Sequence, residues 1–366
     1  MSEHSAVEND GDLEHFWAVI PAGGAGTRLW PLSRQGSPKF LQDLSGTGRT
    51  MIQATYDRLL PLAANRMLVI TGGSHRDAVV AQLEALGADG VVAEPSARDS
   101  MAAIGLAAAL LEVRDPDAVM GSFAADHVIT ADEAFRAATA TAVEAARAGW
   151  LVTIGIEPTH PATGFGYIHV GDPLRDVPGA FAVREFVEKP SAEVAASYVA
   201  RGYRWNAGMF VVRPRVLLDL LAEQDPEFAA ALRGIAADPS TLADVWPSLP
   251  KIAVDHAVAE PAAAAGRVAV VPGAFGWDDI GDFASLEALL RADEAITVLG
   301  DAGLVRAVDA TGIVVPASGR VVAVVGLDDV VVVDTGDALL VTTLERAQDV
   351  KSIVAALKED GLDHLT

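Results

Sequence analysis

The chain has 366 residues, enough for about two domains, and with 51% hydrophobic and 21% charged residues it is able to bury a large core. It holds no cysteine, which excludes disulfides, thiolate metal sites, iron–sulfur clusters and a cysteine nucleophile. With a net charge of −23, the chain lacks the excess of basic residues that is typical of nucleic-acid-binding proteins, and anionic membranes would repel it. The chain starts with acidic and polar residues, and its apolar stretch 101–113 is too short to span a bilayer. We therefore expect a cytoplasmic globular protein without nucleic-acid or membrane partners.

Residues 1–15 are expected to form a flexible tail, after which short β-rich runs alternate with Ala- and Leu-rich segments of helical character. This alternation predicts an α/β domain over 16–292, built on a largely parallel sheet with helices on both faces. The carboxyl ends of such strands meet at one edge of the sheet, where ligands bind. The expected strands are Trp17–Ile20, Met67–Thr71, Gly90–Ala93, Ala118–Phe123 and Leu151–Ile156, and the expected helices are Met51–Leu60, His75–Leu86, Met101–Val113 and Asp132–Ala148.

The middle and the last quarter of the chain have a different character. In the middle, the strands Phe165–Val170, Phe181–Glu188 and Met209–Val212 are expected to extend or flank the main sheet, between helices at Ala192–Ala200 and Val216–Leu221. Valine-rich runs then predict a small β-rich domain over 293–366, a short β-helix or roll closed by a terminal helix at Leu344–Leu357. This domain is a candidate surface for a homodimer. Its expected strands are Ile313–Val315, Val321–Val325, Val330–Val333 and Leu339–Val341.

A glycine-rich loop follows the first strand. Its glycines, within residues 23–28, allow backbone N–H groups to approach an anion closely, while Arg28 adds a forked donor and Lys39 a mobile charge for phosphate oxygens. A dinucleotide-binding fingerprint needs glycine where the chain has Leu29, and the G-K-[ST] of a Walker A loop is absent. The loop is therefore a phosphate cradle of another type.

The segments 29–34 (LWPLSR) and 38–40 (PKF) resemble the signature of nucleotidyltransferases that join a nucleoside triphosphate to a sugar 1-phosphate, and in particular the mannose-1-phosphate guanylyltransferase family. Matching elements recur along nearly the whole chain after residue 15. They include 122–127 (SFAADH), 277–281 (WDDIG), 164–168 (GFGYI), 186–190 (FVEKP), 205–210 (WNAGMF) and, near the C-terminus, the segments 324–330, 334–341 and 347–351. The fold that this resemblance implies is a Rossmann-like core with a mixed, mostly parallel sheet.

The resemblance also implies the roles of individual residues. Arg28, Lys39 and Lys189 would be catalytic, and Asp126 and Asp279 would hold Mg²⁺. Asp255 and Glu260 would support the pocket. The nucleotide would lie against Ala22, Gly23, Gly24, Gly26, Thr27, Arg28, Glu94, Arg98 and Ala125, and the sugar against Gly166, Glu188, Lys189 and Asn206.

The chain departs from the family pattern at three places. Residues 99–103 read DSMAA where the family has Asn-Thr-Ala-Pro-Ala, a stretch next to the base pocket. Ala124 replaces a usual proline, and His256 replaces a usual tyrosine. The departure at 99–103 bears on the choice of base.

The implied reaction joins GTP and mannose 1-phosphate to give GDP-mannose and pyrophosphate. The alternatives are another pair of nucleoside triphosphate and sugar 1-phosphate, or a non-catalytic regulatory paralogue that binds a nucleotide sugar. Because the chain ends too early to hold it, we do not expect the extra isomerase domain that is found in longer, two-function relatives. A hydrolase is disfavoured because the Gly-x-Ser-x-Gly and His-Glu-x-x-His motifs are absent.

Overall fold

The computed structural model describes residues 13–24, 26–291 and 295–366, and its contacts divide the chain into two compact units. Unit 1 comprises residues 1–21, 56–124 and 129–277, and unit 2 comprises 22–55, 125–128 and 278–366. Most of the expected N-terminal tail, residues 1–12, lies outside the described residues, and so does the expected domain boundary at 292/293. The division into domains at these positions stays a prediction.

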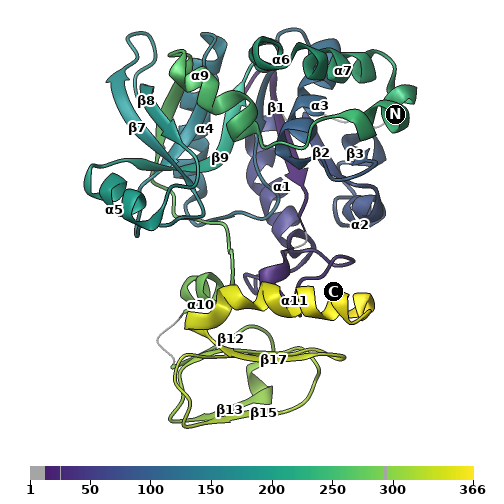
Figure 1. The fold of residues 1–366 in the computed structure, drawn as a ribbon, viewed down its shortest axis with the longest axis vertical. Coiled ribbons are helices and arrows are strands. Elements are labelled where there is room, and N and C mark those ends of the chain that lie inside the picture. Colours follow the sequence, from purple (N-terminus) through teal and green to yellow (C-terminus); the bar gives the residue numbers. More distant parts are fainter. Residues whose placement is uncertain (1–12, 25, 292–294) are drawn as a thin grey trace, which may run out of the picture. The chain divides into compact units, whose positions relative to one another are not determined.

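A nine-stranded sheet forms the centre of unit 1, in the order β3-β2-β1-β4-β9-β6-β10-β8-β7 (Figure 1). The pairs β1–β4, β2–β3 and β6–β10 are parallel, whereas β9 runs antiparallel to both of its neighbours β4 and β6. The strands are β1 (Phe16–Ala22), β2 (Met67–Gly72), β3 (Val91–Glu94), β4 (Val119–Ser122), β6 (Leu151–Ile156), β7 (Gly166–Pro173), β8 (Phe181–Val187), β9 (Arg204–Val212) and β10 (Val268–Gly273). Two short strands, β5 (Val128–Ile129) and β11 (Trp277–Asp278), pair separately.

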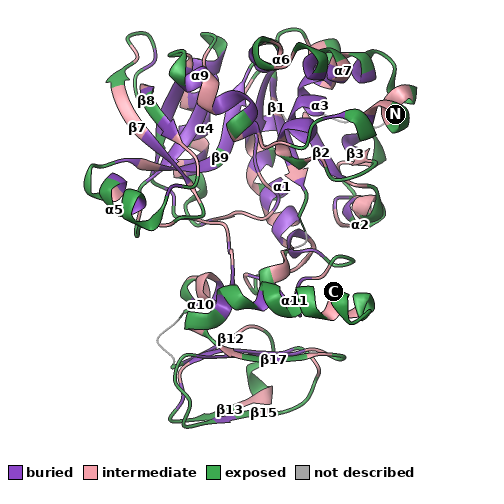
Figure 2. Ribbon diagram, in the orientation of Figure 1, coloured by how far each residue is buried: buried purple, intermediate pink, exposed green. Residues whose placement is uncertain are grey.

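Helices cover the sheet, and most of its strands are buried (Figure 2). The helix α3 is apolar on nearly all sides because it lies between the sheet and the helices α6 and α7. Its Gly105 allows the close approach of α7, since a Cβ at that position would lie 2.6 Å from Leu232 Cδ1. The helices are α1 (Met51–Ala63), α2 (Arg76–Gln82), α3 (Asp99–Arg114), α4 (Asp132–Arg147), α5 (Ala192–Ala200), α6 (Pro214–Gln224), α7 (Pro226–Ala237), α8 (Leu242–Val245) and α9 (Glu260–Ala264), the last preceded by a π-helical turn at Asp255–Ala259.

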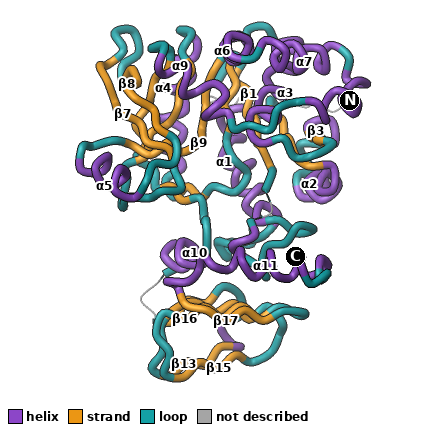
Figure 3. Tube along the Cα trace, viewed as in Figure 1, coloured by secondary structure: helices purple, strands orange, loops and turns teal. Residues whose placement is uncertain are grey.

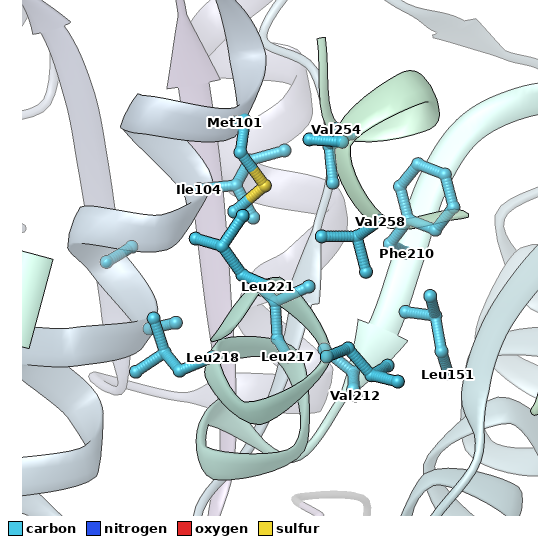
Figure 4. Close-up of a cluster of buried hydrophobic side chains, with 14 of the residues drawn as sticks. Met101, Ile104, Leu151, Phe210, Val212, Leu217, Leu218, Leu221, Val254 and Val258 are labelled. Carbon is cyan, nitrogen blue, oxygen red and sulfur yellow. The ribbon is translucent and has the colours of Figure 1, made fainter. Parts of the chain in front are cut away.

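The core of unit 1 joins these layers. Figure 4 shows Met101 and Ile104 of α3 near Leu217, Leu218 and Leu221 of α6, with side chains of β6 and β9 beside them. All five of these side chains are at most 3% exposed. At about 25 cal/mol per Å² of buried apolar area, such layers supply the main force that holds the sheet and its strand ends in place.

Unit 2 contains a small coil of parallel strands. Ile296 pairs with Gly312, and Gly312 pairs with Val330, so successive turns of the coil repeat after 16 and 18 residues. Figure 3 shows the strands in two layers, with β16 and β17 in one and β13 and β15 in the other. The elements are β12 (Ile296–Val298), β13 (Val305–Val308), β14 (Gly312–Pro316), β15 (Val322–Val325), β16 (Val330–Asp334) and β17 (Leu339–Thr343), with the helices α10 (Phe283–Leu290) and α11 (Val350–Glu359).

The glycine-rich loop of unit 2 is anchored on this coil. Leu29 and Trp30 belong to the same buried cluster as Ile313, Val331 and Val350 of the coil and α11. The Trp30 indole N–H donates to the Leu365 carbonyl at 2.6 Å, next to the C-terminus. The first and last parts of the chain therefore share one core within unit 2.

The predicted fold class is confirmed, with two local differences. The strand expected at Met209–Val212 lies inside the sheet as part of β9, because its Met-Phe-Val-Val run is buried on both faces. The helix expected over Leu344–Leu357 begins as 3₁₀ turns over Leu344–Asp349, and α11 starts at Val350. The first turn deviates because the Leu344 N–H donates to the carbonyl of Asp329 in the coil.

Gly312 lies where the turns of the coil stack. Its φ is +124°, and a Cβ there would overlap the backbone of Val330. We expect Gly312→Ala to lower the free energy of unfolding by about 3 kcal/mol, because the clash is with main chain that is unable to rotate away. Urea unfolding followed by circular dichroism measures the change. Gly326→Ala is the matched control, since Gly326 has φ +65° but open space around its Cβ, and it should cost only about 1 kcal/mol. Equal losses would contradict the steric argument.

Candidate functional site

The glycine-rich loop opens onto a polar pocket of about 280 Å³ within unit 2. The pocket collects residues from four separate segments of the chain. Its lining consists of Gly23, Gly24, Gly26, Thr27, Arg28, Leu29, Lys39, Asp126, Asp279, Ile280 and Gly281. The structure thus brings together most of the predicted phosphate-binding residues and both predicted metal ligands. Of the other predicted residues of this region, Ala22 ends β1 and buried Ala125 directly precedes Asp126.

Backbone conformation explains the glycines of this loop. Gly24 and Gly26 have φ angles of +85° and +61°, in a backbone region that residues with a side chain rarely adopt. A Cβ on Gly26 would also lie 2.9 Å from Lys39 Cβ and 3.2 Å from Ser33 Oγ. Gly26 therefore permits both the turn of the loop and the close passage of the Lys39 stem.

The two cations of the pocket differ in their surroundings. Arg28 is exposed, and its Nη1 donates to the Gly281 carbonyl at 3.4 Å. Lys39 is only 7% exposed, and its ammonium lies 2.7 Å from Asp126 Oδ2. The same ammonium donates to the carbonyls of Asp279 and Ile280. Arg28 thus presents donors to the pocket, whereas Lys39 links two of its walls.

Asp126 and Asp279 provide two carboxylates in the same pocket. Burial raises the pKa of Asp279 above its ordinary value, with Asp278 and Asp126 acting in the same direction and Lys39 and Arg28 opposing them. A bound cation would relieve this electrostatic cost. Among the described residues no group of three or more acidic or histidine side chains forms a metal cluster. Two carboxylates nevertheless fit Mg²⁺, which is typically bound by one or two protein carboxylates together with substrate phosphates and water.

A second polar group lies in unit 1, where β7, β8 and β9 meet. Gly166 of β7 pairs with Asn206 of β9, and Glu188 directly follows β8. A Cβ on Gly166 would overlap Glu188 Oε2 and lie 3.2 Å from Asn206 Cβ. Glu188 Oε2 is buried without a hydrogen-bond partner among the described residues. A buried carboxylate oxygen in this state is costly unless a ligand donates to it.

Asn206 is held by its neighbours on both sides. Thr153 Oγ1 donates to Asn206 Oδ1 at 2.9 Å, and Asn206 Nδ2 donates to Asp255 Oδ1 at 2.7 Å. Burial and the nearby Glu188 charge raise the pKa of Asp255 to about 6, although the Asn206 hydrogen bond and the Lys189 charge oppose this shift. The role of Thr153 was not predictable from the sequence, since a threonine inside an apolar strand belongs to no motif.

Lys189 completes this group with a positive charge. Its ammonium lies 2.8 Å from Glu188 Oε1, and its side chain is 60% exposed. Burial alone would lower the pKa of Lys189, but the hydrogen bond and charge of Glu188, together with Asp255 and Asp99, raise it. Lys189 therefore stays protonated, and more than half of its side chain is exposed although its ammonium lies on Glu188.

His256 and Glu260 brace the Glu188 backbone. His256 Nδ1 lies 2.8 Å from Glu260 Oε2, and the Glu188 N–H donates to Glu260 Oε1 at 3.3 Å. The hydrogen bond and charge of Glu260 raise the pKa of His256 above its ordinary value. Asp255 and Glu260 thus contact Asn206 and Glu188, and their role as supports of a pocket stays a prediction.

The predicted base-pocket residues Glu94 and Arg98 also belong to unit 1, whereas the glycine loop belongs to unit 2. Burial raises the pKa of Glu94 to about 7. The Arg98 guanidinium donates to the carbonyls of Pro247 and Leu249, so it also fixes a loop of its own unit. Their role toward a nucleotide stays a prediction.

Asp255 makes a stability prediction that depends on pH. Its carboxyl has a higher pKa in the folded protein than in the unfolded chain, so the folded state loses stability as pH rises from about 4 to about 6 and does not recover it above that range. Asp255→Asn removes this loss and keeps an acceptor for Asn206. We expect the stability advantage of the variant over the parent protein to grow by about 2 kcal/mol between pH 4 and pH 7.5, measured by urea unfolding. An advantage that is constant with pH would show that the folded carboxyl titrates normally.

Comparisons with known proteins place the chain in a family. The nucleotidyl transferase family model matches residues 17–296, and a model described as a mannose phosphate isomerase/GMP-like β-helix domain matches 303–357. The mannose-1-phosphate guanylyltransferase ManC of Salmonella typhimurium is 40% identical, covering 94% of this chain and 74% of that protein. The mannose-1-phosphate guanylyltransferase of Escherichia coli K12 is 39% identical with the same coverage of both chains, 94% and 74%.

A solved structure agrees with these relatives. The crystal structure described as a mannose-1-phosphate geranyltransferase from Thermus thermophilus is 35% identical to the chain, with a TM-score of 0.85. The similarity covers 94% of this chain and 99% of that one. Nucleotidyltransferases of this kind generally use a divalent metal. No described helix is long and apolar enough to cross a membrane. The chain is a nucleotidyltransferase, and it belongs to the mannose-1-phosphate guanylyltransferase branch of the nucleotidyl transferase family.

Proposed function

We propose that the protein transfers GMP from GTP to mannose 1-phosphate, giving GDP-mannose and pyrophosphate. The observation that carries this proposal is the pocket of unit 2, where a glycine loop, an exposed arginine and two carboxylates lie together. This combination fits a triphosphate with its cation. The choice of substrates follows the names of the relatives from Salmonella and Escherichia coli.

In the proposed complex, the N–H groups of the loop and the Arg28 guanidinium bind the β- and γ-phosphates. Arg28 is suited to this role because it is exposed and offers several donors in a rigid fork. Asp126 and Asp279 would hold Mg²⁺, which when bound neutralises phosphate charge and orients the oxygens of both substrates. Lys39 reaches the phosphates only if its ammonium leaves Asp126.

The polar group of unit 1 is the proposed site for the sugar phosphate. No described residue donates to Glu188 Oε2, and this oxygen would accept a hydrogen bond from a sugar hydroxyl. Asn206 Nδ2 uses one N–H on Asp255, so its other N–H would donate to a sugar hydroxyl, while Asn206 Oδ1 already accepts from Thr153 and from the Gly208 N–H. Lys189 would bind the phosphate of the sugar. Glycine at position 166 lets the side chains of Glu188 and Asn206 lie against the backbone of β7.

The chemistry needs no general base. An oxygen of the sugar phosphate, already ionised at neutral pH, forms a bond to the α-phosphorus of GTP. The bond from that phosphorus to the oxygen bridging to the β-phosphate breaks in line, and pyrophosphate leaves with the electron pair. The protein contributes positions and charges that stabilise the transition state, as in phosphoryl transfer generally.

A homodimer and a cytoplasmic location remain predictions. The strands β15 and β17 expose apolar side chains, including Val325 and Val341. These side chains support the prediction that two copies of the chain associate through the C-terminal coil.

The substrate pair is tested by pyrophosphate release with Mg²⁺. GTP with mannose 1-phosphate should be turned over in preference to ATP, UTP or dTTP, and in preference to glucose 1-phosphate as the control sugar. Preference for another pair would keep the reaction but overturn the substrates. A protein that binds nucleotide sugar but releases no pyrophosphate with any pair would instead be a regulatory paralogue.

Arg28→Ala tests the phosphate pocket. The loss of one charged donor at the transition state should lower kcat by about 10²–10³-fold, while the thermal unfolding curve stays close to that of the parent protein. Arg346→Ala is the matched control, because Arg346 is an exposed arginine that pairs with Asp349 on the tail. Turnover of Arg28→Ala within a factor of about three of the control would remove Arg28 from the mechanism.

A further inference from the structure

The Lys39 ammonium has used all of its hydrogen-bonding capacity. A protonated lysine carries three N–H donors and no acceptor. Lys39 directs them at three protein oxygens, namely Asp126 Oδ2 and the carbonyls of Asp279 and Ile280. In this arrangement it has no donor left for a phosphate.

The position of Lys39 is built into unit 2. Its side chain is 9% exposed, the stem passes against Gly26, and the next residue, Phe40, is 1% exposed. Its acceptors belong to segments more than 80 residues away along the chain, so the ammonium holds the Asp126 segment and the 279–280 segment together. Arg28, by contrast, is exposed and donates to one backbone oxygen, that of Gly281.

Asp126 is also one of the two carboxylates that fit a divalent cation. A metal ion and an ammonium that donates to the same carboxylate oxygen compete for its negative charge. We propose that Lys39 is an internal counter-ion, which occupies Asp126 in the nucleotide-free protein and leaves it when a divalent cation binds there. The inference rests on the assignment of Asp126 to the metal in the proposed function.

This exchange couples the binding of cation and nucleotide. Without nucleotide, a cation that binds Asp126 displaces the ammonium from the carboxylate with which it pairs, so binding of the cation is weak. With a triphosphate present, the released ammonium finds phosphate oxygens as new acceptors, and the cost of its release is offset. The two ligands therefore bind with positive cooperativity.

Titration of the nucleotide-free protein with Mn²⁺ alone, followed by electron paramagnetic resonance of the free ion, tests the competition. Lys39→Met removes the ammonium but keeps a stem of similar length, and it should bind Mn²⁺ on the order of tenfold more tightly than the parent protein. Lys351→Met, an exposed lysine of α11, is the control for the same change in net charge and should bind Mn²⁺ like the parent protein. Asp126→Asn in the Lys39→Met background should abolish the gain.

Each outcome decides the proposal. A Lys39 that binds only phosphate, or one that merely braces the fold, predicts unchanged or weaker Mn²⁺ binding in Lys39→Met, and either result would overturn the inference. An equal gain in Lys351→Met would overturn it too, because the effect would then come from net charge alone.

A second measurement uses the unmodified protein, in case Lys39→Met fails to fold. The sequence holds five lysines, so selective ¹³Cε-lysine labelling gives a countable set of signals. The ¹³Cε signal of Lys39, whose side chain is buried from solvent, should change its chemical shift on addition of Mg²⁺. The chemical shifts of the four other lysines should stay unchanged. A titration that leaves every lysine signal unmoved at saturating Mg²⁺ contradicts the exchange.

The proposed function and this inference fail separately. Tighter Mn²⁺ binding by Lys39→Met in a protein without guanylyltransferase activity would support the counter-ion and reject the substrates. If the parent protein has guanylyltransferase activity but Lys39→Met binds Mn²⁺ no more tightly than the parent protein, the proposed function is supported and the counter-ion role of Lys39 is rejected.

Discussion

The packing of Leu29 and Trp30 into the core of unit 2 is the constraint on which the phosphate pocket depends. A loop built on Gly23, Gly24 and Gly26 has few side chains with which to hold its own conformation. The loop is held in place by Leu29 and Trp30, which are buried among strands of the C-terminal coil. The hydrogen bond from the Trp30 indole to the Leu365 carbonyl adds to this anchoring. The C-terminal coil is therefore part of the scaffold of the pocket, although it lies some 300 residues away along the chain.

The arrangement of charges in this pocket offsets the negative charge of the chain as a whole. A chain with a net charge of −23 that acts on polyanions needs positive charges at the place where the polyanion binds. The pocket combines an exposed guanidinium with a buried ammonium that already has a carboxylate partner. The carboxylates would repel a bare triphosphate, so a cation is needed before phosphate and protein fit each other. In the metal-free pocket the proposed counter-ion, Lys39, balances the charge of Asp126, whose side chain is 28% exposed.

Unit 1 shows the cost of a polar site on an apolar sheet. Glu188 keeps a buried oxygen to which no described residue donates, burial raises the pKa of Asp255 to about 6, and Lys189 adopts a φ of +45°. Each of these features lowers stability, and each makes sense if a polyhydroxylated, charged ligand completes the group. Burial of the large alanine- and leucine-rich core around α3 offsets the loss of folding free energy at this polar group.

In the first half of the chain, strong apolar periodicity and glycine-bearing turns were enough to predict which segments form helices and strands. The residue types of the pocket were also predictable, since the glycine loop, the two acidic elements and the Glu-Lys pair each form a local pattern. The position of β9 inside the sheet, the hydrogen bond from Thr153 to Asn206 and the contact of the Lys39 ammonium with Asp126 could not be predicted in this way. Strand order and side-chain partners join residues far apart in the chain, and local patterns carry no information on which of the many acceptors a donor will reach.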